Sequence, residues 1–196
     1  IRLLTDVAGV HAWAEQYHEG GRGLVAALGD RYPLVVFHGD VGTGKTASFV
    51  LPMLTILEKG RARVRMPRTL ILEPTRELAA QVEENFNKYG QNHRLTVALL
   101  IGGVSFDEQD RKLGRGADVL IATPGRLLDH FERGKLLLNG VEVFVIDEAD
   151  RMLDMGFIPD IERICKLLPP RRQTLFFSAT MPAEIKRLVD TFLKDP

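Results

Sequence analysis

Short apolar runs alternate with amphipathic stretches along most of this chain. The apolar runs predict strands at 33–38, 69–73, 95–101, 118–122, 142–146 and 173–177. Between them, apolar residues recur at helical spacing and predict helices near 45–58, 75–89, 105–114, 125–133, 157–168 and 182–194. Most of the strand runs are continuously apolar at their centres, which is typical of strands covered by helices on both faces.

This alternation predicts an α/β fold with three layers, in which a mainly parallel sheet is flanked by helices through right-handed connections. We expect one such domain over 33–196. Residues 1–32 are expected to form a separate helical segment, because Val7, Val10, Ala14 and Tyr17 recur at helical spacing. In a parallel sheet, ligands bind at the carboxyl ends of the strands, so that edge is the place to look for function.

The loop after the first predicted strand matches the phosphate-binding pattern G-x-x-x-x-G-K-[ST]. Its residues are Gly39, Asp40, Val41, Gly42, Thr43, Gly44, Lys45 and Thr46. Glycines let backbone N–H groups surround phosphate oxygens, and the start of the following helix favours negative charge. Lys45 is expected to reach the β- and γ-phosphates, and the Thr46 hydroxyl to bind Mg²⁺. The strand before the loop and the helix after it favour an ATP or ADP site over a chance glycine-rich turn.

Two adjacent carboxylates follow the fifth predicted strand. Asp147 is expected to hold Mg²⁺ beside Thr46, and Glu148 to orient or deprotonate the water that attacks the γ-phosphate. Lys45, Asp147 and Glu148 are therefore the candidate catalytic residues. The alternative is that the acids only cap a helix, which the phosphate loop makes the weaker interpretation.

Further motifs follow the other strands. They are PTRELAAQ from Pro74, the pair Gly102-Gly103, TPGR from Thr123, DEAD from Asp147 and SAT from Ser178. Their order and spacing resemble the first of the two RecA-like domains of DEAD-box RNA helicases, over about residues 42–196. The resemblance implies ATP-dependent RNA remodelling. It also implies that RNA is bound by Pro74, Thr75, Arg76, Glu77, Gly102, Gly103, Thr123, Pro124, Gly125 and Arg126, and that Asp150, Ser178, Ala179 and Thr180 couple the nucleotide to RNA.

The residue types support an RNA surface independently. Arg76, Arg126 and the helix starts after Thr75 and Pro124 are suitable phosphate donors, and they would contact the backbone of single- or double-stranded RNA without reading its sequence. Each motif alone has an ordinary alternative: Pro and Thr begin helices, and Arg76 could simply pair with a nearby carboxylate. Their joint position at one sheet edge favours RNA.

The amino-terminal part does not resemble the same family. It lacks the Pro-Thr-x-x-Gln segment whose glutamine reads adenine, so Gln16 is not given that role, and base preference stays open. Gly39-Asp40-Val41 is more similar to AAA-type ATPases. We therefore hypothesise a chimera, engineered or recombined, that acts only as a nucleotide-binding module, as the alternative to a divergent natural helicase. A complete AAA-type motor is disfavoured, because the part after Thr46 lacks that family's sensor and lid regions.

Composition and charge limit the possible binding sites and cellular locations further. The 196 residues carry 26 basic and 26 acidic side chains, so any RNA site must be local. No apolar run approaches the length of a membrane span, and the single cysteine, Cys165, fits a buried thiol in a reducing cytoplasm. We expect a cytoplasmic monomer. These residues do not include the second helicase domain that the resemblance implies, so we expect slow ATP hydrolysis and no unwinding by this chain alone.

Overall fold

The computed structural model describes residues 34–38 and 45–193. The strands are β1 (Leu34–His38), β2 (Thr69–Leu72), β3 (Val97–Leu100), β4 (Val119–Ala122), β5 (Val143–Ile146) and β6 (Gln173–Ser178). The helices are α3 (Lys45–Leu57), α4 (Arg76–Tyr89), α5 (Phe106–Gly114), α6 (Pro124–Glu132), α7 (Ala149–Asp154), α8 (Ile158–Leu167) and α9 (Ala183–Phe192). The predictions for residues 1–33 and 39–44, including the amino-terminal helix and the glycine loop, lie outside the described residues.

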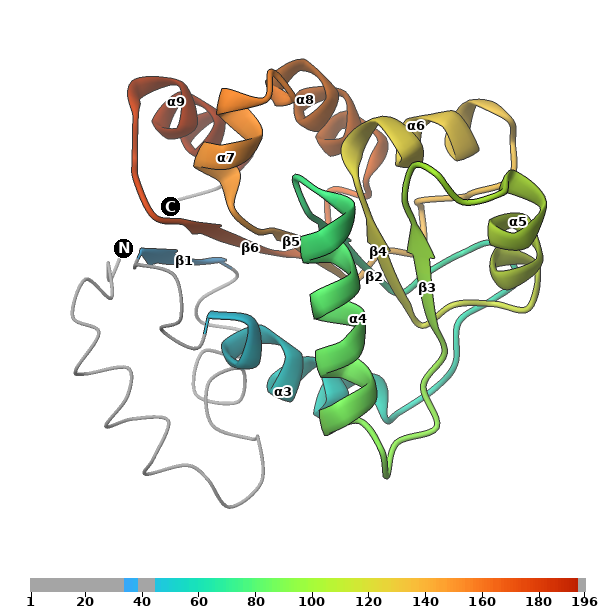
Figure 1. Cartoon of the computed structure of the whole chain (residues 1–196). Coiled ribbons are helices and arrows are strands. Elements are labelled where there is room, and N and C mark those ends of the chain that lie inside the picture. Colours follow the sequence, from blue (N-terminus) through green and yellow to red (C-terminus); the bar gives the residue numbers. More distant parts are fainter. Residues whose placement is uncertain (1–33, 39–44, 194–196) are drawn as a thin grey trace, which may run out of the picture.

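The described strands form one sheet of six in the order β1-β6-β5-β2-β4-β3, and every neighbouring pair is parallel. Helices cover both faces (Figure 1). The three-layer α/β fold predicted from the sequence is therefore confirmed. Because all strands run the same way, the residues that follow them gather at one edge, which we call the carboxyl edge.

Side chains alternate strictly between two apolar layers along the central strands. Leu70 and Leu72 pack into one core with α5, α6, α8 and α9. Ile71, which lies between them, packs into the other core with α3 and α4. A strand buried on both faces must be apolar at successive positions, and this explains the continuous apolar runs in the sequence. The two cores hold the carboxyl edge in place from above and below the sheet.

Helix α7 was not predicted, and it is the main difference from the sequence interpretation. Its six residues directly after Glu148 are too few to show a helical period, and they overlap the DEAD motif. The other boundaries agree with the predicted ranges to within a few residues. Among the described residues, no helix has the length and apolar character that crossing a bilayer requires.

Candidate functional site

Strands β1 and β6 are neighbours, but the helices that follow them cover opposite faces of the sheet. Residues of α3 pack into one core and residues of α9 into the other. In open α/β sheets, ligands bind at the carboxyl edge where neighbouring strands lead to helices on opposite faces. Thr46 lies here in the first turn of α3 and is half-buried. The glycine residues that precede it in the chain lie outside the described residues.

Asp147 and Glu148 extend β5 into the same edge. Asp147 is buried, and its Oδ1 accepts a hydrogen bond from the backbone N–H of Glu148 at 2.9 Å. Glu148 has a left-handed backbone, with φ of 50°, and is the residue before α7. That conformation is uncommon for a residue with a side chain and turns the strand sharply into the helix. A buried carboxylate and a hydroxyl are ligands that suit Mg²⁺, so the residue types at Asp147 and Thr46 fit that ion.

Asp150 joins the start of α7 to the residues after β6. Its Oδ2 accepts hydrogen bonds from the backbone N–H and the hydroxyl of Thr180, at 2.9 and 3.0 Å. Ser178 is fully buried; its Oγ accepts from the Asp150 N–H at 3.2 Å and donates to the Thr180 carbonyl at 2.7 Å. Burial alone would raise the pKa of Asp150, but the hydrogen bonds from Thr180 and Arg151 hold it below its ordinary value. The structure thus joins three predicted coupling residues directly, and half-buried Ala179 lies between two of them.

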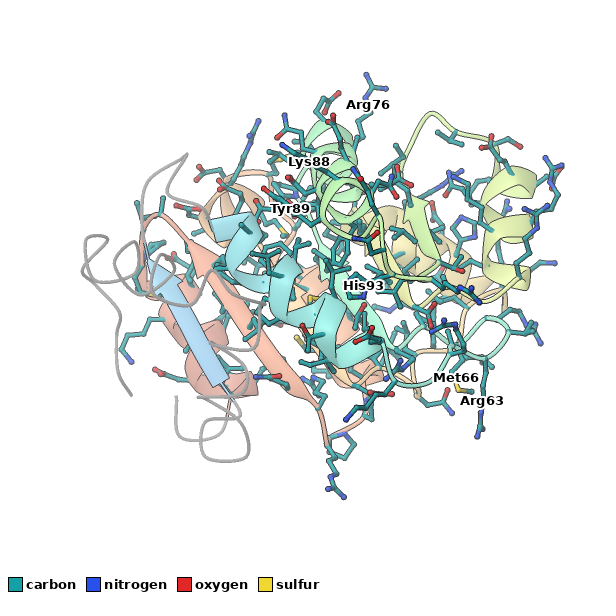
Figure 2. The ribbon with its side chains drawn as sticks, turned by 90° about the horizontal axis from the view of Figure 1, so that it is seen from below. Arg63, Met66, Arg76, Lys88, Tyr89 and His93 are labelled. Atoms are coloured by element: carbon teal, nitrogen blue, oxygen red, sulfur yellow. The ribbon has the colours of Figure 1, made fainter. Side chains whose placement is uncertain are left out.

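The residues after β2 form the exposed part of the edge. Thr75 caps α4, and its hydroxyl accepts a hydrogen bond from the Leu78 N–H at 3.3 Å. Pro74 is buried, whereas Arg76 projects into solvent and pairs with its neighbour Glu77 at 2.7 Å (Figure 2). About two-thirds of each side chain is exposed, so this pair is easily exchanged for another anion.

Gly103 lies against Arg76, although the two residues are 27 positions apart in the chain. A Cβ atom added at Gly103 would lie 3.3 Å from Nη1 of Arg76, and the glycine has φ of 80°, which a side chain rarely adopts. Gly102 is exposed and has open space where a Cβ would stand. The structure therefore brings Gly103 and the arginine of the PTRE motif together, while RNA binding by these residues stays a prediction.

The TPGR residues lie at the carboxyl ends of β4 and β3. The Thr123 N–H donates to the Leu100 carbonyl at 3.1 Å, and Pro124 is the first residue of α6. A Cβ at Gly125 would meet no atom within 4 Å, so space for a ligand is open over the helix start. The guanidinium of Arg126 is not free. It donates to the Val104 carbonyl and to Gln109 Oε1 and stacks on the Phe106 ring, 3.3 Å from the ring centre.

The sequence analysis missed the partners of Arg126. Gln109 is buried, and its amide nitrogen donates to the carbonyls of Ile101 and Val104 at 3.0 and 3.3 Å. It lies on the buried face of α5, three residues after Phe106 and four before Leu113. A glutamine on an otherwise apolar helix face was the signal that could have identified it.

Comparison with known proteins shows the family of the chain. A family model described as DEAD/DEAH box helicase matches residues 26–188. The chain belongs to this family. The match begins before residue 42, where the sequence analysis placed the start of the resemblance, and so includes part of the segment interpreted as unlike the family. The chimera hypothesis stays a prediction.

The chain is similar to curated relatives of the DEAD/DEAH box family. The chain is 44% identical over 162 residues to the DEAD-box ATP-dependent RNA helicase CshA of Bacillus subtilis, covering 83% of this chain and 32% of that protein. It is 47% identical over 158 residues to the RNA helicase CrhR of Synechocystis, covering 80% and 31%. The chain therefore spans about a third of the length of these curated relatives.

Solved structures of the family share the fold. A DEAD box protein from Methanococcus jannaschii superposes with a TM-score of 0.80 at 36% identity, covering 100% of this chain and 53% of that one. The yeast DEAD-box splicing factor Prp28 gives a TM-score of 0.82 at 32% identity, covering 90% and 43%. The predicted RecA-like fold is thereby confirmed.

Proposed function

We propose that this chain is the nucleotide-binding domain of an ATP-dependent RNA helicase, in which ATP and the RNA backbone bind at neighbouring parts of the carboxyl edge. The observation that carries the proposal is the contact between Asp150 of the DEAD motif and Thr180 of the SAT motif. These motifs follow adjacent strands, β5 and β6. A hydrogen-bonded contact between them is a physical route by which a change at one could move the other.

At the nucleotide, Lys45 would bind the phosphates, and Thr46 and Asp147 would hold Mg²⁺. The bound Mg²⁺ would neutralise charge on the β- and γ-phosphates. Glu148 would accept a proton from the attacking water; its position directly after Asp147, at the left-handed backbone turn before α7, supports this role. ADP would remain bound by the same phosphate contacts.

At the RNA, the starts of α4 and α6 would face phosphate groups. Helix starts carry unpaired N–H groups and a positive potential, and the exposed guanidinium of Arg76 adds a full charge. Gly102 and Gly125 leave open space that lets a sugar-phosphate backbone approach. Binding of this kind depends on salt and tolerates many sequences.

The relatives are about three times longer than the matched region, so unwinding belongs to the proposal for the whole protein. An arginine supplied from outside the domain raises hydrolysis by about 10³–10⁵ in related phosphoryl transfers. We therefore expect these 196 residues to bind ATP and RNA as a monomer, with slow turnover.

Nucleotide and RNA titrations test the proposal. Lys45→Ala is expected to weaken Mg-ADP binding by at least about tenfold, because a charged contact to phosphate is worth more than about 1.4 kcal/mol. The control is Lys88→Ala, in the last turn of α4, which should leave nucleotide binding unchanged. Nucleotide binding without any RNA binding at low salt would support the nucleotide-only module instead. Equal affinity for ATP and GTP would show that no base reader operates.

A further inference from the structure

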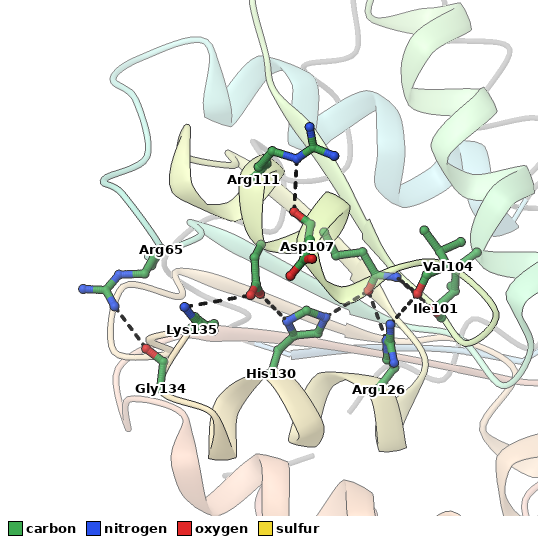
Figure 3. Close-up of polar contacts among 11 residues, drawn as sticks. Arg65, Ile101, Val104, Asp107, Arg111, Arg126, His130, Gly134 and Lys135 are labelled. Atoms are coloured by element: carbon green, nitrogen blue, oxygen red, sulfur yellow. Dashed lines mark hydrogen bonds and ion pairs between the residues drawn. The ribbon is translucent and has the colours of Figure 1, made fainter.

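His130 lies at the centre of a buried polar chain that leads to Arg126. Its ring is fully buried in α6, with Nδ1 2.9 Å from Asp110 Oδ1 and Nε2 3.0 Å from Gln109 Oε1. The same Gln109 oxygen accepts the Nε–H of Arg126 at 3.2 Å. Figure 3 shows the His130 ring with a polar contact on each side and Arg126 nearby. None of the nucleotide or RNA roles proposed above uses this histidine.

The hydrogen-bond partners of Gln109 show which nitrogen of the His130 ring carries a proton. The Gln109 amide nitrogen already faces two carbonyls, those of Ile101 and Val104, so the amide oxygen must be the atom that faces Arg126 and His130. An oxygen cannot donate, so Nε2 of His130 has to carry hydrogen for this contact to be a hydrogen bond. A neutral ring that keeps this proton turns a lone pair toward the Asp110 carboxylate. Only the doubly protonated ring satisfies both neighbours.

Several groups decide how readily the ring takes up the second proton. Burial lowers the pKa of His130 below its ordinary value of 6.5, the carboxylate of Asp110 opposes that effect, and the nearby guanidinium groups of Arg126 and Arg133 add to it. Lys135 Nζ lies 4.0 Å from the other Asp110 oxygen. The centre of the Phe106 ring lies 5.0 Å from the centre of the imidazole.

We propose that His130 is a positioning residue for RNA binding: it donates to Gln109 and thereby holds the oxygen that orients the guanidinium of Arg126. The proposal rests on the proposed function, in which the TPGR residues contact RNA. In the doubly protonated state every contact in the chain from Asp110 to Arg126 is a hydrogen bond. In the neutral state one of the two ring contacts is lost. The tautomer protonated at Nε2 keeps the contact to Gln109 but no longer donates to Asp110, so the ring itself is less firmly oriented. The tautomer protonated at Nδ1 keeps the contact to Asp110 and no longer donates to Gln109.

Two matched substitutions separate positioning from simple packing. His130→Gln places an amide N–H near the position of Nε2, so it retains a donor to Gln109 that does not titrate. His130→Asn places its amide nearer the position of Nδ1, so it faces Asp110 and leaves Gln109 without that donor. Both variants keep a polar group in the same buried place. A purely structural role would make them equivalent.

RNA binding by the full 196-residue chain, measured with a fluorescent single-stranded oligonucleotide from pH 5 to 8, tests the proposal. We expect His130→Asn to weaken binding by about fivefold, the equivalent of one hydrogen bond, and His130→Gln to change it by less than about twofold. Affinity of the unmodified chain should rise as the pH falls below 6.5, and this rise should be absent from His130→Gln. Equal losses in both variants, or no loss in either, would overturn the proposal.

Arg126→Lys, which keeps the charge but loses the guanidinium, separates this inference from the function on which it rests. If it weakens RNA binding while the histidine variants do not, the RNA site stands and the positioning role is wrong. If it leaves RNA binding unchanged, the RNA role of Arg126 is wrong. In that case the Nε–H resonance of Arg126 decides the positioning role, because it must follow the titration of the His130 ring. A resonance that does not move with that titration overturns it.

Discussion

The two halves of the carboxyl edge hold their motif residues in different ways. At β5 and β6, Asp150, Ser178 and Thr180 hydrogen-bond to one another. At β2, β4 and β3, Arg126 is held by Val104 and Gln109, which belong to no motif, and Arg76 reaches solvent. The polar groups named in the first half hydrogen-bond within that half, whereas the second half is partly exposed to solvent. Substitutions in the first half should therefore cost stability, whereas those in the second should mainly cost RNA affinity.

Ser178→Ala is the substitution expected to have the largest effect on folding. The hydroxyl is fully buried and serves as both acceptor and donor, so its removal leaves the Asp150 N–H and the Thr180 carbonyl without that partner. We expect the free energy of unfolding to fall by about 2 kcal/mol, measured by urea denaturation. Ser105→Ala is the control, since that exposed serine precedes α5 without a side-chain capping bond. Equal effects of the two substitutions would contradict the comparison.

Asp150→Ala should lower the free energy of unfolding somewhat less than Ser178→Ala does, although it removes more hydrogen bonds. The carboxylate accepts from two groups of Thr180 and from the Arg151 N–H, but it is partly exposed, and water can replace part of what is lost. A decrease of about 1.5 kcal/mol in the free energy of unfolding is expected. Asp154→Ala, at the exposed end of the same helix, is the matched control and should be neutral.

The Asp150 carboxylate makes the stability of the fold depend on pH. Because the pKa of Asp150 is lowered in the folded state, its stabilising effect is complete above its ordinary value of 3.8 and is lost as the pH falls below that value. The difference in unfolding free energy between the unmodified chain and Asp150→Asn should therefore shrink between pH 7 and pH 3. A difference that stays constant over this range would show that the Thr180 contacts do not depend on the charge.

The contrast between the halves also explains what could be predicted from the sequence. The strands were predictable because burial on both faces makes them continuously apolar, and the motifs because phosphate chemistry needs glycine, lysine and paired acids in a fixed order. Helix α7 was too short to show a period. Gln109 and His130 belong to no motif, and only their polarity on apolar helix faces marks them. Their partners, Arg126 and Asp110, are 17 and 20 positions away in the chain, so the contacts depend on tertiary structure.

Arg76→Ala gives the smallest change in folding and tests the open half directly. Its guanidinium pairs only with exposed Glu77 among the described groups, and such a pair contributes little to stability, so the urea midpoint should not change. RNA affinity should fall, and the slope of its logarithm against the logarithm of salt concentration should decrease by about 1, as expected when one phosphate contact is lost. Lys88→Ala, at the other end of α4, should leave that slope unchanged. A shifted urea midpoint with an unchanged salt slope would mean that Arg76 supports the fold, and that the two halves of the edge do not differ as the structure indicates.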